Sequence, residues 1–135
     1  MSHIVTVRTQ VRDPVALAAA CQRLGLEAPA SGTADLFSGK AEGHLVQLPG
    51  WRYPIVFDLH SGRVQLDNYN GHWGEQARLD KLLQLYAVEK ARCEARRQGH
   101  RVTEQPLLDG SIKLVIHDGG PDLRQGAGAG EGGAA

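Results

Sequence analysis

Two short stretches of the chain combine aromatic rings with groups that carry charge or form hydrogen bonds. The first lies between Pro49 and Pro54, and the second covers Asn68 to Gly74. Aromatic, arginine and asparagine side chains on loops that contain glycine are typical of recognition surfaces. The sequence therefore predicts a binding site formed by Trp51, Arg52, Tyr53, Tyr69, Asn70, His72 and Trp73.

The other residues that carry chemistry do not form a recognisable catalytic or metal-binding pattern. The six histidines are never closer than twelve residues apart, whereas zinc ligands commonly occur as a closely spaced pair. His44 and His117 could still meet across a sheet, but the spacing predicts no metal site. The chain has no GxSxG nucleophile motif and no glycine-rich phosphate loop that leads into a helix. We expect Asp58 and Asp67 to be solvated carboxylates, and we predict no cofactor and no catalytic residues.

Charge and cysteine content exclude several classes of protein. The 135 residues carry 15 basic and 15 acidic side chains, and this zero net charge argues against a nucleic-acid partner. A basic run from Lys90 to Arg101 is interpreted as a solvated helix end. Cys21 and Cys93 form no CxxC pair and are expected to be buried thiols. No apolar stretch approaches the length of a membrane span, so we expect a cytoplasmic protein with no membrane partner.

Hydrophobic periodicity predicts the elements that position the two aromatic stretches. A helix begins at Asp13-Pro14 and stops at Gly25, because aspartate caps and proline starts helices while glycine ends them. A second, long helix covers residues 75–98 and is ended by Gly99. Its predicted core stripe consists of Leu79, Leu82, Leu83, Tyr86 and Cys93. Residues 26–40 are interpreted as a connecting loop. The expected strands are 4–11, 44–48, 55–59, a strand containing Val64 and Leu66, and a hairpin of 102–108 with 111–117 around Asp109-Gly110.

This order of elements, β-α-β-β-β-α-β-β, predicts an α+β fold. We expect an antiparallel sheet of about six strands with both helices packed on one face. A single domain is predicted over residues 1–118. Residues 119–135 are predicted to be a disordered tail rich in glycine and alanine.

The predicted meander brings the two aromatic stretches together. Alternate turns of an up-down-up meander lie at opposite ends of the sheet, so residues 49–54 and 68–74 share one end and Ser61-Gly62 lies at the other. In the alternative interpretation, the large rings fold back to close the end of the core. The long helix also carries a second apolar stripe that is either covered by other elements or presented to a partner: Leu85, Val88, Ala91 and Ala95.

Six segments of the chain carry a resemblance to a known family: Met1–Ile4, Gln47–Pro54, Asn68–Glu75, Tyr86–Lys90, Gly99–Gln105 and Asp109–Leu114. Together they resemble an uncharacterised family of conserved open reading frames from plastids, cyanobacteria, other bacteria and some phages, catalogued as domain of unknown function 1257. The resemblance covers almost all of residues 1–118 but not the tail. It implies a small accessory protein, with an AAA-type ATPase as an expected partner, and it assigns no activity.

Two functions from different classes fit these observations. The first is a non-enzymatic interaction module that binds a protein partner, or a second copy of itself, through the aromatic residues and the outer face of the long helix. The second is a ligand-binding or catalytic domain that holds a small anion or nucleotide against Trp51 and Trp73, with Arg52 and His72 supplying charge and proton transfer. Single-stranded nucleic-acid binding by stacking is a third hypothesis, which the neutral charge disfavours. The absence of a catalytic pattern favours the interaction module.

Overall fold

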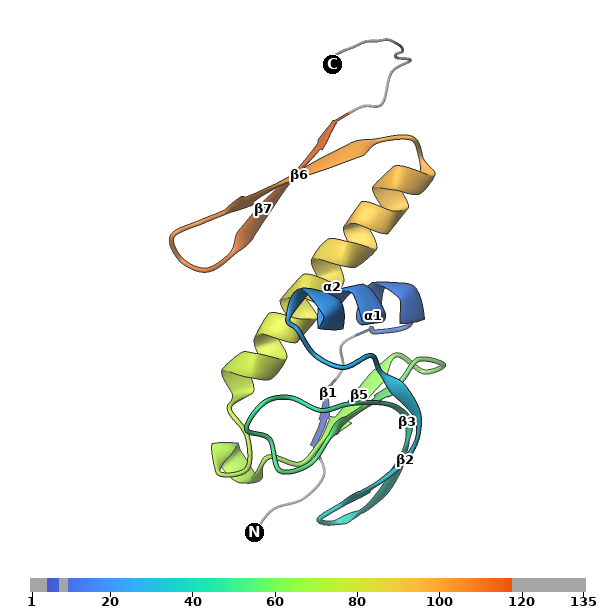
Figure 1. Cartoon of the computed structure of the whole chain (residues 1–135), viewed down its shortest axis with the longest axis vertical. Coiled ribbons are helices and arrows are strands. Elements are labelled where there is room, and N and C mark those ends of the chain that lie inside the picture. The colour runs from blue at the N-terminus through green and yellow to red at the C-terminus, as the bar shows by residue number, and fades with distance from the viewer. Residues whose placement is uncertain (1–4, 8–9, 118–135) are drawn as a thin grey trace. The chain divides into compact units, whose positions relative to one another are not determined.

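The computed structural model describes residues 5–7 and 10–117, and these residues form an α+β fold. The chain divides into two compact units, residues 1–89 and 90–135, with the boundary inside the second α-helix. The described part of the chain contains two α-helices, a short 3-10 helix and seven strands (Figure 1). The predicted α+β class with antiparallel pairing is confirmed.

A five-stranded antiparallel sheet forms the centre of the first unit, with the strand order β1-β5-β4-β3-β2. Its register is set by pairs such as Val5 with Leu66 and Val46 with Ile55. Strands β2, β3, β4 and β5 form the predicted meander, which has one strand more than expected. The bounds are β1 Val5–Val7, β2 Ala30–Leu36, β3 Gly39–Val46, β4 Ile55–Asp58 and β5 Arg63–Leu66.

The prediction of a loop over residues 26–40 is wrong, because most of this stretch is strand β2 and the start of β3. Figure 1 shows β2 and β3 as a long curved hairpin. Alternate residues at its tip are buried: Ala34 and Leu36 on β2, and Ala41 on β3. These side chains form a small second core with Val56 of β4. One face of the hairpin near its tip is therefore part of a core, whereas the turn itself, residues 37–40, is exposed.

Helix α1 (Pro14–Arg23) begins and ends where its caps predict. The Asp13 carboxylate accepts hydrogen bonds from the N–H groups of Val15 and Ala16, at 2.9 and 3.2 Å. Gly25 follows the helix with a φ of +72°, the left-handed conformation that glycine adopts without strain. The helix buries its side chains Ala16, Leu17, Ala20 and Cys21.

Helix α2 (Gln76–Arg97) is joined to the segment before α1 and to α1 itself through side chains. The Tyr86 hydroxyl accepts hydrogen bonds from the N–H groups of Arg12 and Asp13, both at 3.1 Å. Arg23 of α1 forms an ion pair of 2.9 Å with Glu89. These contacts hold the two helices together across more than sixty residues of sequence.

The second apolar stripe of α2 is not a free surface. Leu85, Val88 and Ala95 are each at most 5% exposed, and Ala91 is half-buried. In the predicted core stripe, Leu79, Leu82 and Tyr86 are buried, whereas Leu83 is only half-buried and Cys93 is partly exposed. The outer face of the long helix is therefore removed from the surfaces that could bind a partner. Among the described residues, neither helix is apolar over enough of its length to cross a membrane.

The second unit contains the predicted carboxy-terminal hairpin, formed by β6 (Arg101–Pro106) and β7 (Ile112–His117). It is a separate two-stranded sheet and does not extend the larger one. Gly110 makes the turn with a φ of +91°, as the Asp109-Gly110 pair predicts. Arg92 of α2 ties the helix to β6 through an ion pair with Glu104 at 3.2 Å. The single domain over residues 1–118 stays a prediction, and the glycine-rich tail lies outside the described residues.

Candidate functional site

The two aromatic loops meet at one end of the five-stranded sheet, as the meander predicts. The loop between β3 and β4 and the loop after β5 are joined by the main chain, because the N–H of Arg52 donates to the carbonyl of Trp73 at 2.8 Å. The second loop contains the 3-10 helix η1 (Tyr69–Gly71), so Asn70 lies on it. Its turn is closed by the carbonyl of Asn68, which accepts from the N–H groups of Gly71 and Trp73 at 3.0 and 2.9 Å.

Trp73 is the centre of a group of rings that pack edge to face or tilted. Its ring centroid lies 4.9 Å from that of Tyr69, 5.5 Å from that of Tyr53 and 5.2 Å from that of Phe37. Such separations lie within the range of favourable aromatic pairs. We name this group, with the two polar residues that stack on it, the Trp73 cluster: Phe37, Arg52, Tyr53, Tyr69, His72 and Trp73.

Arg52 adds a positive charge to the cluster. Its guanidinium carbon lies 4.9 Å from the Trp73 ring and 5.6 Å from the Tyr53 ring, close enough for cation–π attraction. His72 stacks on Tyr69, with the ring centroids 4.9 Å apart. The side chains of Arg52 and His72 are exposed, so their polar groups face solvent at the edge of the rings.

The cluster leaves apolar surface open to water. Phe37 is 56% exposed and Tyr69 is 37% exposed, while Tyr53 and Trp73 are half-buried. Tyr69 is also the one described residue other than glycine with a positive φ, at 48°. Such a backbone conformation is unfavourable for a bulky side chain and is often found at functional sites. The loop thus holds a strained residue whose ring is presented at the surface.

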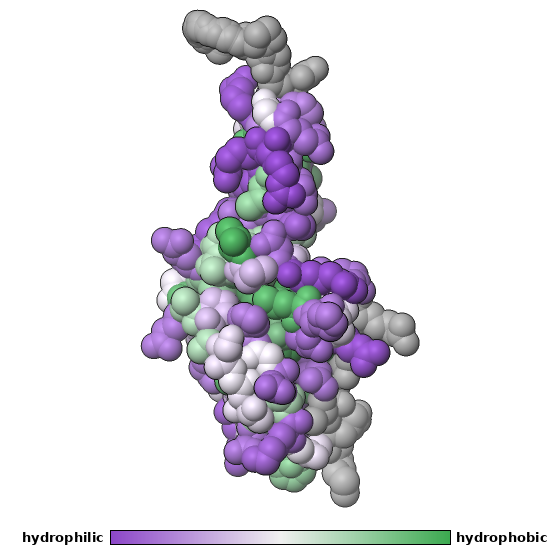
Figure 2. Space-filling model, turned by 90° about the vertical axis from the view of Figure 1, so that its right-hand side faces the viewer, coloured by the Kyte–Doolittle hydropathy of each residue, from purple (hydrophilic) through white to green (hydrophobic). Residues whose placement is uncertain are grey.

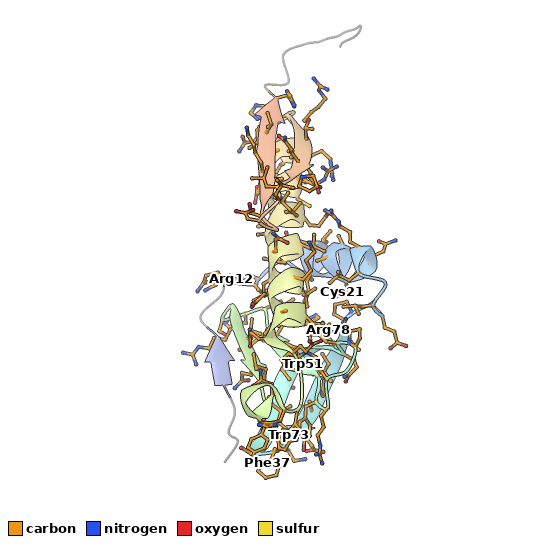
Figure 3. The ribbon with its side chains drawn as sticks, turned by 90° about the vertical axis from the view of Figure 1, so that its left-hand side faces the viewer. Arg12, Cys21, Phe37, Trp51, Trp73 and Arg78 are labelled. Carbon is orange, nitrogen blue, oxygen red and sulfur yellow. The ribbon has the colours of Figure 1, made fainter. Side chains whose placement is uncertain are left out.

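Trp51 does not belong to this surface. It is 5% exposed, and its indole N–H donates to the main-chain carbonyl of Glu75 at 3.2 Å. Its ring lies directly against Gly74, where a Cβ atom would come within 2.2 Å of the ring. In Figure 3, Phe37 and Trp73 lie together and Trp51 lies apart from them. For Trp51 the structure therefore matches the alternative interpretation, a ring that closes the core.

Phe37 is the member of the cluster that the sequence does not identify. It lies at the turn between β2 and β3, inside the stretch for which the sequence predicts a connecting loop. The available signal is a single large aromatic residue among small and polar neighbours. An aromatic residue at a turn either presents its ring at the surface or closes the end of a hydrophobic core.

Asp67 differs most from its expected environment. The sequence predicts a solvated carboxylate, but the side chain is fully buried, and neither of its oxygens has a hydrogen-bond partner in the described structure. It directly precedes Asn68, the residue whose carbonyl closes the second aromatic loop. A buried polar group without a partner is costly, so Asp67 places an unfavourable group at the base of this loop.

The carboxylates whose pKa values shift belong to turns, not to a catalytic centre. Hydrogen bonds from the hydroxyl and the N–H of Ser61 lower the pKa of Asp58. Those from Ser111 lower the pKa of Asp109 in the β6–β7 turn. Among residues 5–7 and 10–117, no group of three His, Cys, Asp or Glu side chains is arranged to hold a metal ion. The described arrangement can present rings and one guanidinium to a partner, but it shows no acid–base pair at the cluster.

No protein family, curated protein or solved structure matches this chain. The resemblance to the open-reading-frame family therefore stays a prediction that rests on the segments quoted above.

Proposed function

We propose that this protein is a non-enzymatic interaction module that binds a protein partner through the Trp73 cluster. The observation that carries the proposal is the exposure of Phe37 and Tyr69 around a half-buried tryptophan that also stacks on an arginine. Tryptophan, tyrosine and arginine are the residue types that most often dominate the free energy of binding at protein interfaces.

The cluster is organised before a partner binds. The contacts of Trp73 with Tyr53 and Tyr69 restrict the rings, and the stacking on Trp73 restricts Arg52. Less side-chain entropy is then lost on association. A partner that matches this surface would place apolar side chains against Phe37 and Tyr69 and a carboxylate near Arg52.

A nucleotide or small anion fits the same surface less well. Arg52 is the one member of the cluster that is positively charged at every physiological pH, and the net charge of the chain is zero. Phosphate groups are usually held by several donors at once. The alternative of a nucleotide-binding domain therefore requires more fixed positive charge than the single guanidinium that the cluster contains.

Photo-crosslinking in the native host tests the proposal. A photoreactive phenylalanine analogue at position 37 or 69 should crosslink one protein reproducibly, and the same analogue at position 15 should not. Val15 is the matched control, because it is an exposed apolar residue of the first unit (67%) outside the cluster. The resemblance makes an AAA-type ATPase the first candidate to look for among the products.

Substitution then measures the contribution of the surface. Phe37→Ser and Tyr69→Ser should each weaken capture of the crosslinked protein by about tenfold or more, since interface hot spots contribute about 2 kcal/mol or more. Val15→Ser should leave capture unchanged. Equal loss in all three variants, or crosslinking from position 15 alone, would contradict the proposal. A thermal shift with millimolar nucleotide that disappears in Trp73→Ala would favour the ligand-binding alternative.

A further inference from the structure

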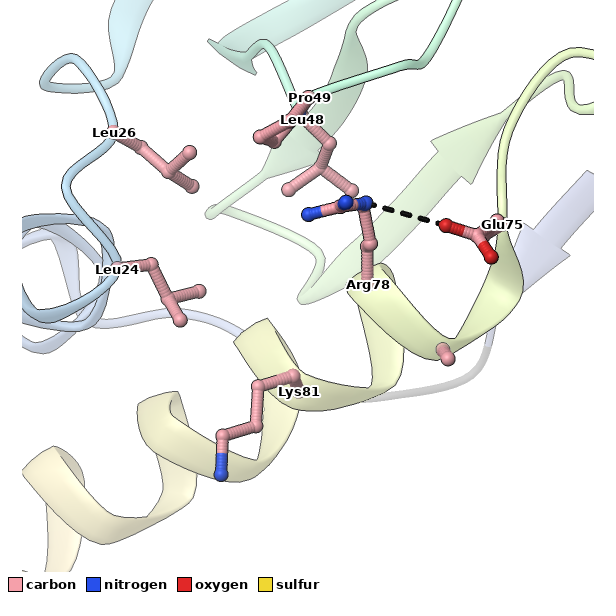
Figure 4. A pocket seen from close by; sticks show the side chains of 8 residues that line it. Leu24, Leu26, Leu48, Pro49, Glu75, Arg78 and Lys81 are labelled. Carbon is pink, nitrogen blue, oxygen red and sulfur yellow. Dashed lines mark ion pairs between the residues drawn. The ribbon is translucent and has the colours of Figure 1, made fainter.

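A pocket of about 230 Å³ lies in the first unit, away from the Trp73 cluster. Three elements form it: the loop after α1, the loop after β3 and the first turns of α2 (Figure 4). None of the residues that line it is a member of the Trp73 cluster. They are Leu24, Leu26, Leu48, Pro49, Glu75, Ala77, Arg78 and Lys81.

The walls of the pocket are apolar on two sides. Figure 4 shows Leu24 and Leu26 on one side, with Leu48 and Pro49 facing them from the other. Leu48 is fully buried (1% exposed), so the wall it forms is part of the core and is fixed in place. Pockets that hold drug-sized ligands usually measure roughly 300–1,000 Å³, so the occupant of this smaller pocket is a smaller molecule with an apolar body.

The third side of the pocket carries charge. The Arg78 side chain extends between the apolar walls in Figure 4, and Lys81 lies about one helical turn further along α2. Arg78 is paired with Glu75 at 3.4 Å, an exposed contact in which the arginine is 50% and the glutamate 75% exposed. An exposed pair of this kind is weak, so an anion inside the pocket can compete with Glu75 for the guanidinium. The pocket thus combines apolar walls with the Arg78 guanidinium and a single competing carboxylate, while Lys81, whose ammonium donates to Gln84 at 3.0 Å, lies at its edge. Figure 2 shows one face of the molecule, on which hydrophobic residues lie among a mostly hydrophilic surface.

We infer that this pocket binds a small aliphatic carboxylic acid, with the hydrocarbon chain between the leucines and the carboxylate on Arg78. The carboxylate forms the bidentate hydrogen bonds that suit a guanidinium, and Lys81 adds positive charge at the edge. Ala77 lies on α2 next to Arg78 and lines the pocket with a small side chain. The inference is independent of the proposed protein interaction, because the two sites share no residue.

Titration of the whole protein with sodium octanoate, followed by amide NMR, tests the inference. Octanoate should give saturable shifts that concentrate on residues 24–26, 48–49 and 75–81. Octan-1-ol, which has the same chain without the charge, should bind about tenfold more weakly, and Arg78→Gln should weaken octanoate binding by a similar factor. Glu75→Gln should tighten binding, because it removes the carboxylate that competes for Arg78.

Two further variants separate a pocket from a general effect of charge. Ala77→Leu should abolish octanoate binding by filling the space, although every charge is retained. Arg63→Gln removes an exposed positive charge from β5, outside the pocket, and should leave binding unchanged. The inference is overturned by an absence of saturable shifts at millimolar octanoate. Binding that survives Ala77→Leu, or that falls equally in Arg78→Gln and Arg63→Gln, would overturn it as well.

Discussion

Replacement of Gly74 by alanine tests how Trp51 closes the core. The added Cβ would lie 2.2, 2.5 and 2.6 Å from three atoms of the Trp51 ring, whereas carbon atoms in contact are about 3.5–4.0 Å apart. The ring would have to retreat by about 1.3 Å, yet it is buried and hydrogen-bonded to the Glu75 carbonyl. Overpacking costs about 1–3 kcal/mol, and a weakened hydrogen bond adds about 1 kcal/mol. We expect Gly74→Ala to lower the free energy of unfolding by about 2–4 kcal/mol, with a fall in Tm of roughly 8 °C or more.

Urea unfolding of a double-mutant cycle identifies the cause. In a Trp51→Leu background the clash is absent, so Gly74→Ala should cost less than about 1 kcal/mol there. Gly71→Ala is the matched control from the same loop. Gly71 has a φ of +93°, and a Cβ added to it would meet no atom within 4 Å, so its cost, about 1 kcal/mol, should be equal in both backgrounds. A cost for Gly74→Ala that does not depend on residue 51 would refute the packing argument.

Three further predictions concern other parts of the fold. Gly43→Ala should lower the free energy of unfolding, measured with urea, several times more than Gly32→Ala does. A Cβ at position 43 would lie 2.5 Å from a main-chain carbonyl oxygen of β4, whereas a Cβ at position 32 would lie 3.6 Å from a side chain. Equal costs would contradict the close approach of β3 to β4. Burial raises the pKa of the Cys21 thiol to about 11, so mass spectrometry should find it unlabelled by thiol reagents at neutral pH until the protein unfolds. Hydrogen bonds from Ser111 lower the pKa of Asp109 below 3.8, so the Asp109 carboxylate stabilises the fold above its unfolded pKa and loses this effect as the pH falls through its folded pKa. Ser111→Ala should raise the pKa of Asp109 in an NMR titration. An unchanged pKa would contradict the assignment of the shift to Ser111.

Elements with strong local signals could be predicted from the sequence, and strand β2 could not. The Asp13 cap, the Gly25 stop and the Asp109-Gly110 turn each depend on the conformational preference of one or two residues. Strand β2 contains alanine, glycine, serine and aspartate, which have low β propensity. It is a strand because β3 pairs with it along its whole length, and tertiary pairing of this kind is not encoded in local preference.

The candidate site shows the same division between local and tertiary information. The meander topology predicts that the two loops lie together, and the main-chain hydrogen bond from Arg52 to Trp73 joins them. Which rings are exposed depends on neighbours that are distant in sequence. Trp51 is covered because Gly74 leaves room for its ring, and Phe37 joins the cluster through the β2–β3 hairpin, which has no strong local signal. The burial of Asp67 likewise depends on the assembled sheet.

The order of the strands has a consequence for how the chain assembles. Strands β2, β3 and β4 each pair with the next strand along the chain, so these hairpins can form in succession with short loops to close. Strand β1 pairs with β5, and this contact requires closure of the whole chain between Val7 and Val64. Strand β1 leaves the ribosome before β5 and must therefore wait for this neighbour until the meander has been synthesised. Until then β1 has no partner strand, and its unpaired main-chain groups leave the nascent chain open to association with other chains.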